Sequence, residues 1–365
     1  MKVTPVYLFK IKRYNSLLIK KSLKKILASQ ESFANFIRKG AVIWVKPNMF
    51  QGFLPSKCVT THPSVVKAVI EIIQEKGAKV VVGDNPAGLP SGSLEKYLKI
   101  VHITGIKRVV EETGATLIYP DKAKKVNLSP FGLKEVSEFI GKVNGIINVP
   151  KLKGHGLMVI SGAIKNMFGV IPGLRKLDCH AIYQQPDKFA QFLIGLERYI
   201  KPQLTIMDAI KIVDKEGSIR RKPKLVGALL AGKSSLAVDI VAAKLLRLDP
   251  LKVPVIAQYL LHEKRINFLE QISIVGSPLE DFKLPRLSFL TENLKKYPVR
   301  LARKGDERFI PKFDLKKCRF CGSCLFICPG KALRIRKEKI KFISKNCIRC
   351  YCCIEVCNYG AISLD

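Results

Sequence analysis

Nine of the eleven cysteines in this chain lie between Cys318 and Cys357. Eight of them form two copies of the spacing C-x2-C-x2-C-x3-C: Cys318, Cys321, Cys324 and Cys328, then Cys347, Cys350, Cys353 and Cys357. Three cysteines on one tight loop can bind three irons of a cubane cluster, and the fourth, on the following helix, points towards the other cluster. The spacing therefore predicts two [4Fe-4S] clusters that carry out one-electron transfer.

Zinc and disulfides are the alternative uses of so many cysteines. Structural zinc sites usually pair two C-x2-C units rather than two four-cysteine runs. Disulfides need a secretory route, and Lys10, Lys12 and Arg13 stand where a signal peptide needs its apolar core. We therefore expect a cytoplasmic protein whose cysteines bind clusters.

Residues 313–365 resemble the bacterial two-cluster ferredoxins over their whole length. The expected ligands of cluster one are Cys318, Cys321, Cys324 and Cys357, and those of cluster two are Cys347, Cys350, Cys353 and Cys328. Pro329 follows the first motif as in those ferredoxins, but Asn358 replaces the second proline, so we expect cluster one to be the more labile. Cys352 is expected to be a neighbouring thiol, because only Cys353 keeps the register of the repeat.

The rest of the chain must supply the framework for this segment. Short hydrophobic runs alternate with helical patterns, and such runs are typical of strands buried on both faces of a parallel sheet. We predict strands at 41–47, 79–84, 115–120, 145–151, 203–208, 224–232 and 271–276. Pro5 predicts that the first hydrophobic run is at most an edge strand.

The predicted fold class is α/β, a mainly parallel sheet flanked by helices, with a small C-terminal α+β dicluster ferredoxin domain. Helices are predicted after Pro63 and over 189–200. The expected domain organisation is an α/β domain at 1–276, a linker or strap at 277–312 with one short helix at 288–296, and the ferredoxin domain at 313–365.

Polar residues follow several of these strands. In open parallel sheets, ligands bind beyond the carboxyl ends of the strands, so we expect a site there. The polar residues at these positions are Lys46, Asn48, Asp84, Asn85, Lys151, Lys153, His155 and Asp208, with Lys165 and Asn166 in the apolar run that follows.

These motifs resemble the iron–sulfur proteins grouped as domain-of-unknown-function family 362. The resemblance spans most of residues 42–275. It rests on a KPN turn at Lys46, a PKLK-x-H segment from Lys151 to His155, and a GAIKN-x-FG segment that contains Lys165 and Asn166. Asp84, Asp208 and Asp239 also belong to the pattern. It implies the α/β fold and an association with iron–sulfur clusters.

The strand-end lysines can form a cation box for a phosphate or carboxylate. The expected substrate-binding residues are Lys46, Asn48, Asp84, Lys151, Lys153, Asn166 and Asp208, and the expected catalytic residues are His155 and Lys165. His155 lies between two glycines and is the best proton donor or acceptor of the set. A metal site of His155, His180 and Asp208 is an alternative that sequence separation does not decide, and Cys58 is expected to be an ordinary cysteine.

The stretch GALLAGKS from Gly227 to Ser234 matches the phosphate-loop pattern G-x4-G-K-[ST]. Its intervening residues are apolar and read as the strand itself, and Pro223 leaves little room for a strand before Gly227. We therefore predict a strand here, with a helix that starts at Ser234 or Ser235 and ends near Leu246.

The formal net charge is +35, with lysines scattered along almost the whole chain. A basic stripe interleaved with aromatic residues is missing, so we expect no nucleic-acid partner. We also expect no membrane span, because no apolar run reaches about 18 uncharged residues. The expected partners are an acidic redox protein and a small anionic ligand.

Three functions fit these features. The first is an oxidoreductase that passes electrons from the clusters to a small anionic substrate or cofactor at the strand ends. The second is a non-catalytic electron carrier that docks an acidic redox partner. The third is a nucleotide-dependent factor in cofactor assembly that uses the stretch from Gly227 to Ser234.

Overall fold

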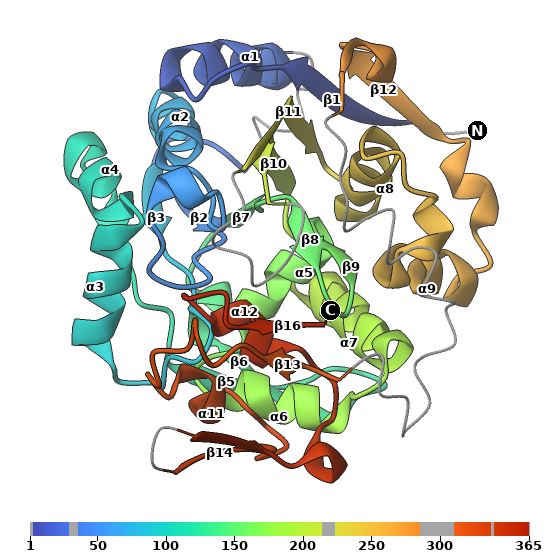
Figure 1. The fold of residues 1–365 in the computed structure, drawn as a ribbon. Helices are drawn as coiled ribbons and strands as arrows, with labels where there is room; N and C mark the ends of the chain where they lie inside the picture. Colours follow the sequence, from blue (N-terminus) through green and yellow to red (C-terminus); the bar gives the residue numbers. More distant parts are fainter. Residues whose placement is uncertain (1–2, 29–35, 214–222, 285–309, 337–338, 365) are drawn as a thin grey trace.

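The computed structural model describes residues 3–28, 36–213, 223–284, 310–336 and 339–364. Its centre is an eight-stranded sheet (Figure 1). In spatial order the strands are β12 (Ile272–Gly276), β1 (Thr4–Lys10), β11 (Lys224–Gly232), β10 (Leu204–Ile212), β7 (Gly145–Val149), β2 (Val42–Pro47), β3 (Lys79–Val82) and β4 (Thr116–Leu117).

The sheet is mainly parallel. The strands from β10 through β7, β2 and β3 to β4 all pair in parallel, and so do β1 and β12. Only β11 runs against its two neighbours, β10 and β1. All seven strands predicted from hydrophobic runs lie in this sheet, which confirms the α/β fold class.

The expectation for the first hydrophobic run is wrong, because β1 lies inside the sheet and pairs on both sides. Pairing with β12 spans Thr4 to Leu8, whereas pairing with β11 begins at Tyr7. Pro5 therefore lies outside the ladder with β11, so its missing N–H leaves that ladder intact.

Helices cover both faces of the sheet. One face packs against α1 (Ser16–Ala28), α2 (Pro63–Gln74), α3 (Leu94–Ile103) and α4 (Ile106–Thr113). The other packs against α5 (Ala163–Asn166), α7 (Pro186–Ile200), α8 (Ser235–Leu245) and α9 (Pro254–His262). In β2, Ile43 and Val45 belong to the first core and Trp44 to the second, as alternation along a strand requires.

Two short hairpins and one further helix complete this part of the chain. One hairpin joins β5 (Ala123–Asn127) to β6 (Leu133–Ser137), and the other joins β8 (Lys153–His155) to β9 (Val159–Ser161). Helix α6 (Arg175–Ile182) lies beside the C-terminal segment (Figure 1).

The C-terminal segment is small and packs against the larger sheet domain. Its elements are β13 (Lys312–Phe313), α11 (Ser323–Phe326), β14 (Leu333–Arg336), β15 (Lys339–Phe342), α12 (Cys352–Val356) and β16 (Ile362–Ser363). Tyr351, Ile354 and Ile362 belong to the same apolar core as α7. The two parts of the chain therefore share a core. Residues 285–309, which include most of the expected linker and its predicted helix, lie outside the described residues.

The phosphate-loop pattern belongs to a strand, as predicted. Residues 224–232 form β11, and Ser234 caps α8 by accepting a hydrogen bond from the backbone N–H of Ala237 at 3.2 Å. The four residues between the two glycines are buried inside the sheet, so their N–H groups do not form a phosphate-binding loop.

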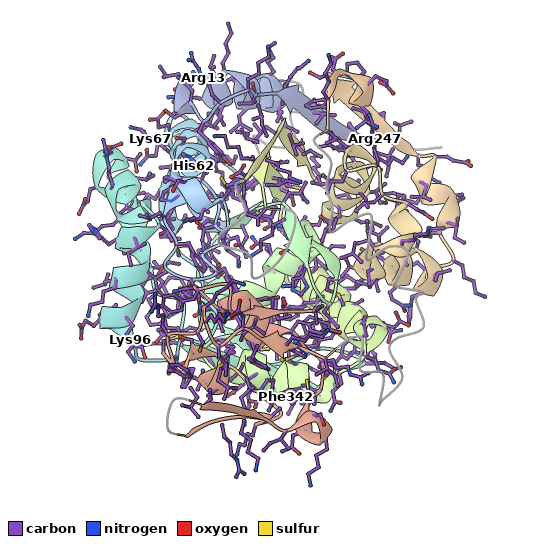
Figure 2. The ribbon with its side chains drawn as sticks, in the orientation of Figure 1. Arg13, His62, Lys67, Lys96, Arg247 and Phe342 are labelled. Atoms are coloured by element: carbon purple, nitrogen blue, oxygen red, sulfur yellow. The ribbon has the colours of Figure 1, made fainter. Side chains whose placement is uncertain are left out.

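Basic side chains lie on several sides of the molecule. Arg13, Lys67, Lys96 and Arg247 stand at different places around its edge (Figure 2). This distribution fits a solvated basic surface rather than one continuous stripe. Within the described residues, no helix combines the length and the apolar character that crossing a membrane requires.

Candidate functional site

The motif cysteines of the two repeats influence one another's pKa, and the two ligand sets stay a prediction. Burial raises the pKa of the Cys324 thiol to about 11, and negative charge at Cys357, Cys321 and Cys318 adds to the shift. Burial also raises the pKa of Cys353 well above its usual value, helped by Cys350, Cys347 and Cys328. The group around Cys324 includes Cys357 from the second repeat, and the group around Cys353 includes Cys328 and Cys324 from the first.

Backbone N–H groups point at the sulfurs of three of these cysteines. Phe320 donates to Sγ of Cys318 at 3.3 Å, Ala332 to Sγ of Cys328 at 3.3 Å, and Ala361 to Sγ of Cys357 at 3.2 Å. Such bonds favour the thiolate and are among the contacts that set the potential of an iron–sulfur cluster. The residues present therefore fit the predicted clusters.

The turns after Cys328 and Cys357 have the same hydrogen bonds although only the first contains proline. Lys331 donates to the Cys328 carbonyl at 3.1 Å, and Gly360 donates to the Cys357 carbonyl at 3.2 Å. Asn358 lacks the fixed φ of proline, so the second turn loses more entropy when it forms. The greater lability of cluster one stays a prediction.

In the described part of the chain, no three His, Cys, Asp or Glu side chains are close enough to hold a single metal ion. Asp208 pairs with Lys151 and His155 contacts Glu355, so His155, His180 and Asp208 are not gathered into a metal site.

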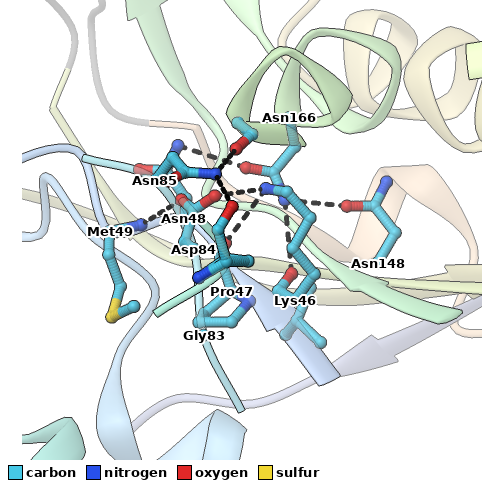
Figure 3. A network of polar contacts seen from close by, with 12 residues as sticks. Lys46, Pro47, Asn48, Met49, Gly83, Asp84, Asn85, Asn148 and Asn166 are labelled. Carbon is cyan, nitrogen blue, oxygen red and sulfur yellow. Dashed lines mark hydrogen bonds and ion pairs between the residues drawn. The ribbon is translucent and has the colours of Figure 1, made fainter. Parts of the chain in front are cut away.

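At the strand ends, a buried ion pair joins β2 to the loop after β3. Nζ of Lys46 lies 2.7 Å from Oδ1 of Asp84, and the other carboxylate oxygen accepts the backbone N–H of Met49 at 2.9 Å (Figure 3). Burial lowers the pKa of Lys46, while Asp84 partly restores it. A Cβ atom at Gly169 would lie 2.1 Å from Asp84 Oδ1, so the GAIKN-x-FG segment needs glycine where it crosses this pair.

Three asparagines form a chain of hydrogen bonds beside this pair. Asn48 donates to the side chain of Asn166 at 3.2 Å, and Asn166 donates to that of Asn148 at 2.7 Å (Figure 3). Asn148 donates in turn to the carbonyl of Ala163 at 2.9 Å. Each amide is oriented by the next, so the ends of β2 and β7 are tied to α5.

Asp239, quoted in the family resemblance, has a structural role in the same region. Its carboxylate accepts the backbone N–H groups of Ala163 and Ile164 at 2.6 and 3.0 Å, at the start of α5. Burial raises its pKa to about 7, although these two hydrogen bonds oppose the shift. Gly162 leaves room for it, because a Cβ atom there would lie 2.1 Å from Asp239 Oδ1.

Lys151 and Asp208 form a second, separate ion pair. Nζ of Lys151 lies 2.9 Å from Oδ1 of Asp208 and 2.9 Å from the hydroxyl of Tyr14. Asp208 also accepts the backbone N–H of His62 at 3.0 Å. Both charged side chains are buried, and this group ties the N-terminal loop to the strand ends.

His155 joins the sheet domain to the cysteine segment. Its Nδ1 accepts the backbone N–H groups of Leu157 and Met158 at 3.0 and 3.1 Å, and its Nε2 lies 2.8 Å from a carboxylate oxygen of Glu355. Burial lowers the pKa of His155 to about 4, so the ring is neutral at neutral pH and Nε2 carries the proton. Beside it, Nζ of Lys153 lies 4.4 Å from the ring centre of Phe50.

A cavity of about 70 Å³ lies between the strand ends and the cysteine segment. This volume holds a few water-sized groups and is too small for a nucleotide. Its polar wall comes from the sheet domain: Asn48, Asp84, Asn85, Ser161, Lys165, Asn166, Lys176 and His180. Its opposite wall comes from the cysteine segment: Ile327, Cys352, Glu355 and Val356.

The cavity contains four of the nine predicted substrate-binding or catalytic residues, Asn48, Asp84, Lys165 and Asn166. Lys46 lies behind Asp84, whereas Lys151, Lys153, Asp208 and His155 are not among its lining residues. Sequence reasoning missed Lys176, whose Nζ donates to the carbonyl of Asn85 at 3.0 Å. Lys176 reaches the cavity wall only through tertiary packing. No pattern in the sequence therefore distinguishes it from the other lysines.

Replacing Lys46 with Met tests the buried pair. This change leaves the Asp84 carboxylate buried without its cation, so we expect a loss of about 3 to 5 kcal/mol in the free energy of unfolding. Lys20→Met is the matched control, because Lys20 pairs with Glu71 and Glu75 at 2.9 Å nearer the surface and should cost about 1 kcal/mol or less. Anaerobic denaturant unfolding measures both, and equal losses would contradict the account.

Replacing Cys352 tests the ligand sets. Its thiol lies 3.9 Å from the Cys350 carbonyl and is buried, so Cys352→Ser should keep all eight predicted irons. Cys353→Ser is the matched control and should lose about half of the iron, because it removes a ligand of cluster two. Iron analysis of anaerobically reconstituted protein decides the assignment, and iron loss from the Cys352 variant alone would reverse it.

Comparisons with known proteins match two separate parts of the chain. Residues 43–244 match the family described as a domain of unknown function (DUF362), and residues 310–358 match the 4Fe-4S dicluster domain. The thylakoid-associated protein sll1697 of Synechocystis sp. is 31% identical over 259 residues, which cover 70% of this chain and 78% of that protein.

Among solved structures, the lactate racemase apoprotein from Thermoanaerobacterium thermosaccharolyticum aligns with a TM-score of 0.41 and 11% identity, covering 64% of this chain and 55% of that one. The family match itself spans more than half of the sequence. This chain therefore belongs to the DUF362 family and carries a 4Fe-4S ferredoxin-type domain at residues 310–358.

Proposed function

We propose that this protein is an iron–sulfur oxidoreductase that passes electrons to a small anionic ligand in the cavity between its two domains. The observation that carries the proposal is the composition of the cavity wall. Polar residues of the strand ends face Ile327 and Cys352, which directly precede the predicted cluster ligands Cys328 and Cys353. A ligand held there is next to a predicted cluster.

Cluster one would be held by Cys318, Cys321, Cys324 and Cys357, and cluster two by Cys347, Cys350, Cys353 and Cys328. When bound, such clusters supply one-electron transfer at low potential. The chain itself supplies the remaining functions: it binds and orients the ligand, limits the water around it and holds protons near it.

The charges at the cavity wall favour an anion. Asp84 is balanced by Lys46 at 2.7 Å, whereas Glu355, 2.8 Å from the neutral ring of His155, keeps its single negative charge. Lys165 and Lys176 add two cations to the wall, and neither has a carboxylate within ion-pair distance in the described residues. Charge-assisted hydrogen bonds from these lysines would therefore hold a carboxylate or another oxyanion.

His155 acts through Glu355 in this proposal rather than by touching the ligand. Two backbone N–H groups hold its ring, and Nε2 fixes the Glu355 carboxylate at the cavity wall. Lys165, which lines the cavity, is the proposed proton donor to the ligand. His155 is accordingly a positioning residue, and Lys165 the catalytic residue.

Anaerobic reoxidation tests the proposed reaction. Protein reduced with dithionite and freed of excess reductant is mixed with nitrite, sulfite, bicarbonate or pyruvate, and cluster absorbance is followed, with phosphate as a non-reducible control. We expect one compact anion to reoxidise the protein, and Lys165→Met to weaken its binding by about 1 to 3 kcal/mol without loss of iron.

The matched control is Lys188→Met, an exposed lysine that does not line the cavity. If no anion reoxidises or stabilises the protein, the chain is an electron carrier and the proposal fails.

The pH dependence of anion binding tests the role of Lys176. Burial lowers the pKa of Lys176 to about 7, so its charge is present below neutrality and lost as the pH rises. Affinity for a non-titrating anion should therefore fall about threefold to tenfold from pH 6 to pH 8. Lys176→Met should abolish this dependence and Lys165→Met should keep it. An unchanged slope in the Lys176 variant would exclude this residue from binding.

A further inference from the structure

The two sets of cysteines differ in their access to solvent. Of the eight motif cysteines, all of which the structure describes, only Cys321 is exposed. Cys321 belongs to the set predicted for cluster one. A partner protein can therefore approach this set from outside, because electron transfer between proteins needs a short distance and not a deep cleft.

Both sets contact the sheet domain, at different places: Cys318, Cys324 and Cys357 pack on the large core that contains α7, whereas Cys350 packs beside the cavity. Cys350 packs in one apolar group with Ile327, Cys352 and Val356, against Phe50 and Leu177. All of these except Cys350 line the cavity. Helix α11, which contains Cys324, packs against α12, which contains Cys353, so the two sets adjoin each other. The first set thus reaches solvent at Cys321, and Cys350 of the second set packs with residues that line the cavity.

Exposed apolar and basic side chains lie near Cys321 in the sequence, between Leu315 and Phe326. Leu315 and Phe326 are 50% and 53% exposed, and Lys316 and Arg319 are exposed within the same segment. We call Leu315, Lys316, Arg319, Cys321 and Phe326 the entry face. Exposed apolar side chains beside charges of one sign are typical of a surface that binds a protein of the opposite sign.

The charge of this segment favours an acidic partner. Residues 311–365 contain twelve Lys and Arg but only four Asp and Glu. Of these four, the structure describes Asp314, which pairs with Lys317, and Glu355, which is largely buried beside His155. Among the described residues, no carboxylate forms an ion pair with Lys316 or Arg319, so the basic charge of the entry face favours an acidic protein.

We infer that the entry face docks an acidic one-electron carrier protein, which supplies the electrons for the proposed function and so depends on that proposal. In each encounter the carrier would be oxidised by one electron, and the cluster held by the set containing Cys321 would be reduced by one. The electron would then pass to the cluster held by the second set, beside the cavity. Two encounters supply an electron pair for the ligand, and protons come from solvent through the cavity wall.

Charge reversal on the entry face tests this inference. The variant is Lys316→Glu/Arg319→Glu, and the matched control is Lys21→Glu/Lys25→Glu on α1, where both lysines are exposed. Helix α1 and Arg13 lie at the opposite end of the molecule from Phe342 and the C-terminal segment (Figures 1 and 2). Both variants change the net charge equally, so only position differs.

The probe is a reduced plant-type [2Fe-2S] ferredoxin of strongly negative charge, mixed anaerobically with the cluster-loaded chain. At low ionic strength, the entry-face variant should be reduced about tenfold more slowly and bind the oxidised probe about tenfold more weakly in calorimetry, while the control changes by less than about twofold. Reduction by dithionite should be equal in all three proteins, and about 0.5 M salt should remove the difference.

Equal slowing of both variants, or no slowing in either, would overturn the inference. Slower reduction by dithionite in the entry-face variant would also overturn it, because damage to the cluster would then explain the result. These outcomes differ from failure of the proposed function, since ligand-dependent reoxidation of dithionite-reduced protein requires no carrier.

Discussion

The buried ion pair between Lys46 and Asp84 is the constraint on which the site depends. A lysine and a carboxylate without solvent are tolerated only when they meet each other and their remaining hydrogen bonds are made. Asp84 contacts Lys46 at 2.7 Å through Oδ1 and accepts the N–H of Met49 at 2.9 Å through Oδ2. The pair joins β2 to the loop after β3 and requires glycine at position 169. The pair thereby fixes the strand ends that form the polar wall of the cavity. The hydrogen-bonded asparagines and Lys165 lie at this wall.

The cysteine segment supplies the second wall and shares its core with the sheet domain. Tyr351, Ile354 and Ile362 pack with α7, and His155 reaches Glu355 at 2.8 Å. A short segment with eight ligand cysteines buries little apolar surface by itself, so cluster binding and this shared core together must stabilise it. The same packing brings one set of cysteines against the cavity and leaves Cys321 in solvent. The packing that stabilises the segment therefore also decides which cysteines lie near the cavity and which lie near solvent.

The sequence predicted the sheet well because its strands are continuous hydrophobic runs, and it predicted both cysteine sets because their spacing is specific. The prediction that β1 is at most an edge strand was wrong. A proline prevents hydrogen bonding only on the side to which its N–H would point, so the strand can still pair elsewhere. Lys151 and Asp208 end their strands as expected, but they pair with each other. Lys176 and Glu355 reach the cavity through contacts between segments distant in sequence, which no local pattern reveals. Polar residues at the strand ends therefore predicted the edge of the sheet at which the site lies. Which residues line the cavity depends on tertiary packing, which the sequence does not show.

The most direct test of the central claim is the position of the iron. An anaerobic crystal structure of the cluster-loaded chain, with anomalous scattering recorded at the iron edge, locates both clusters without reference to activity. The account predicts two four-iron peaks, one beside solvent-exposed Cys321 and one beside Phe50 and Leu177 at the cavity wall. A single peak, or a second peak remote from that wall, would contradict the claim that a ligand in the cavity receives electrons from an adjoining cluster.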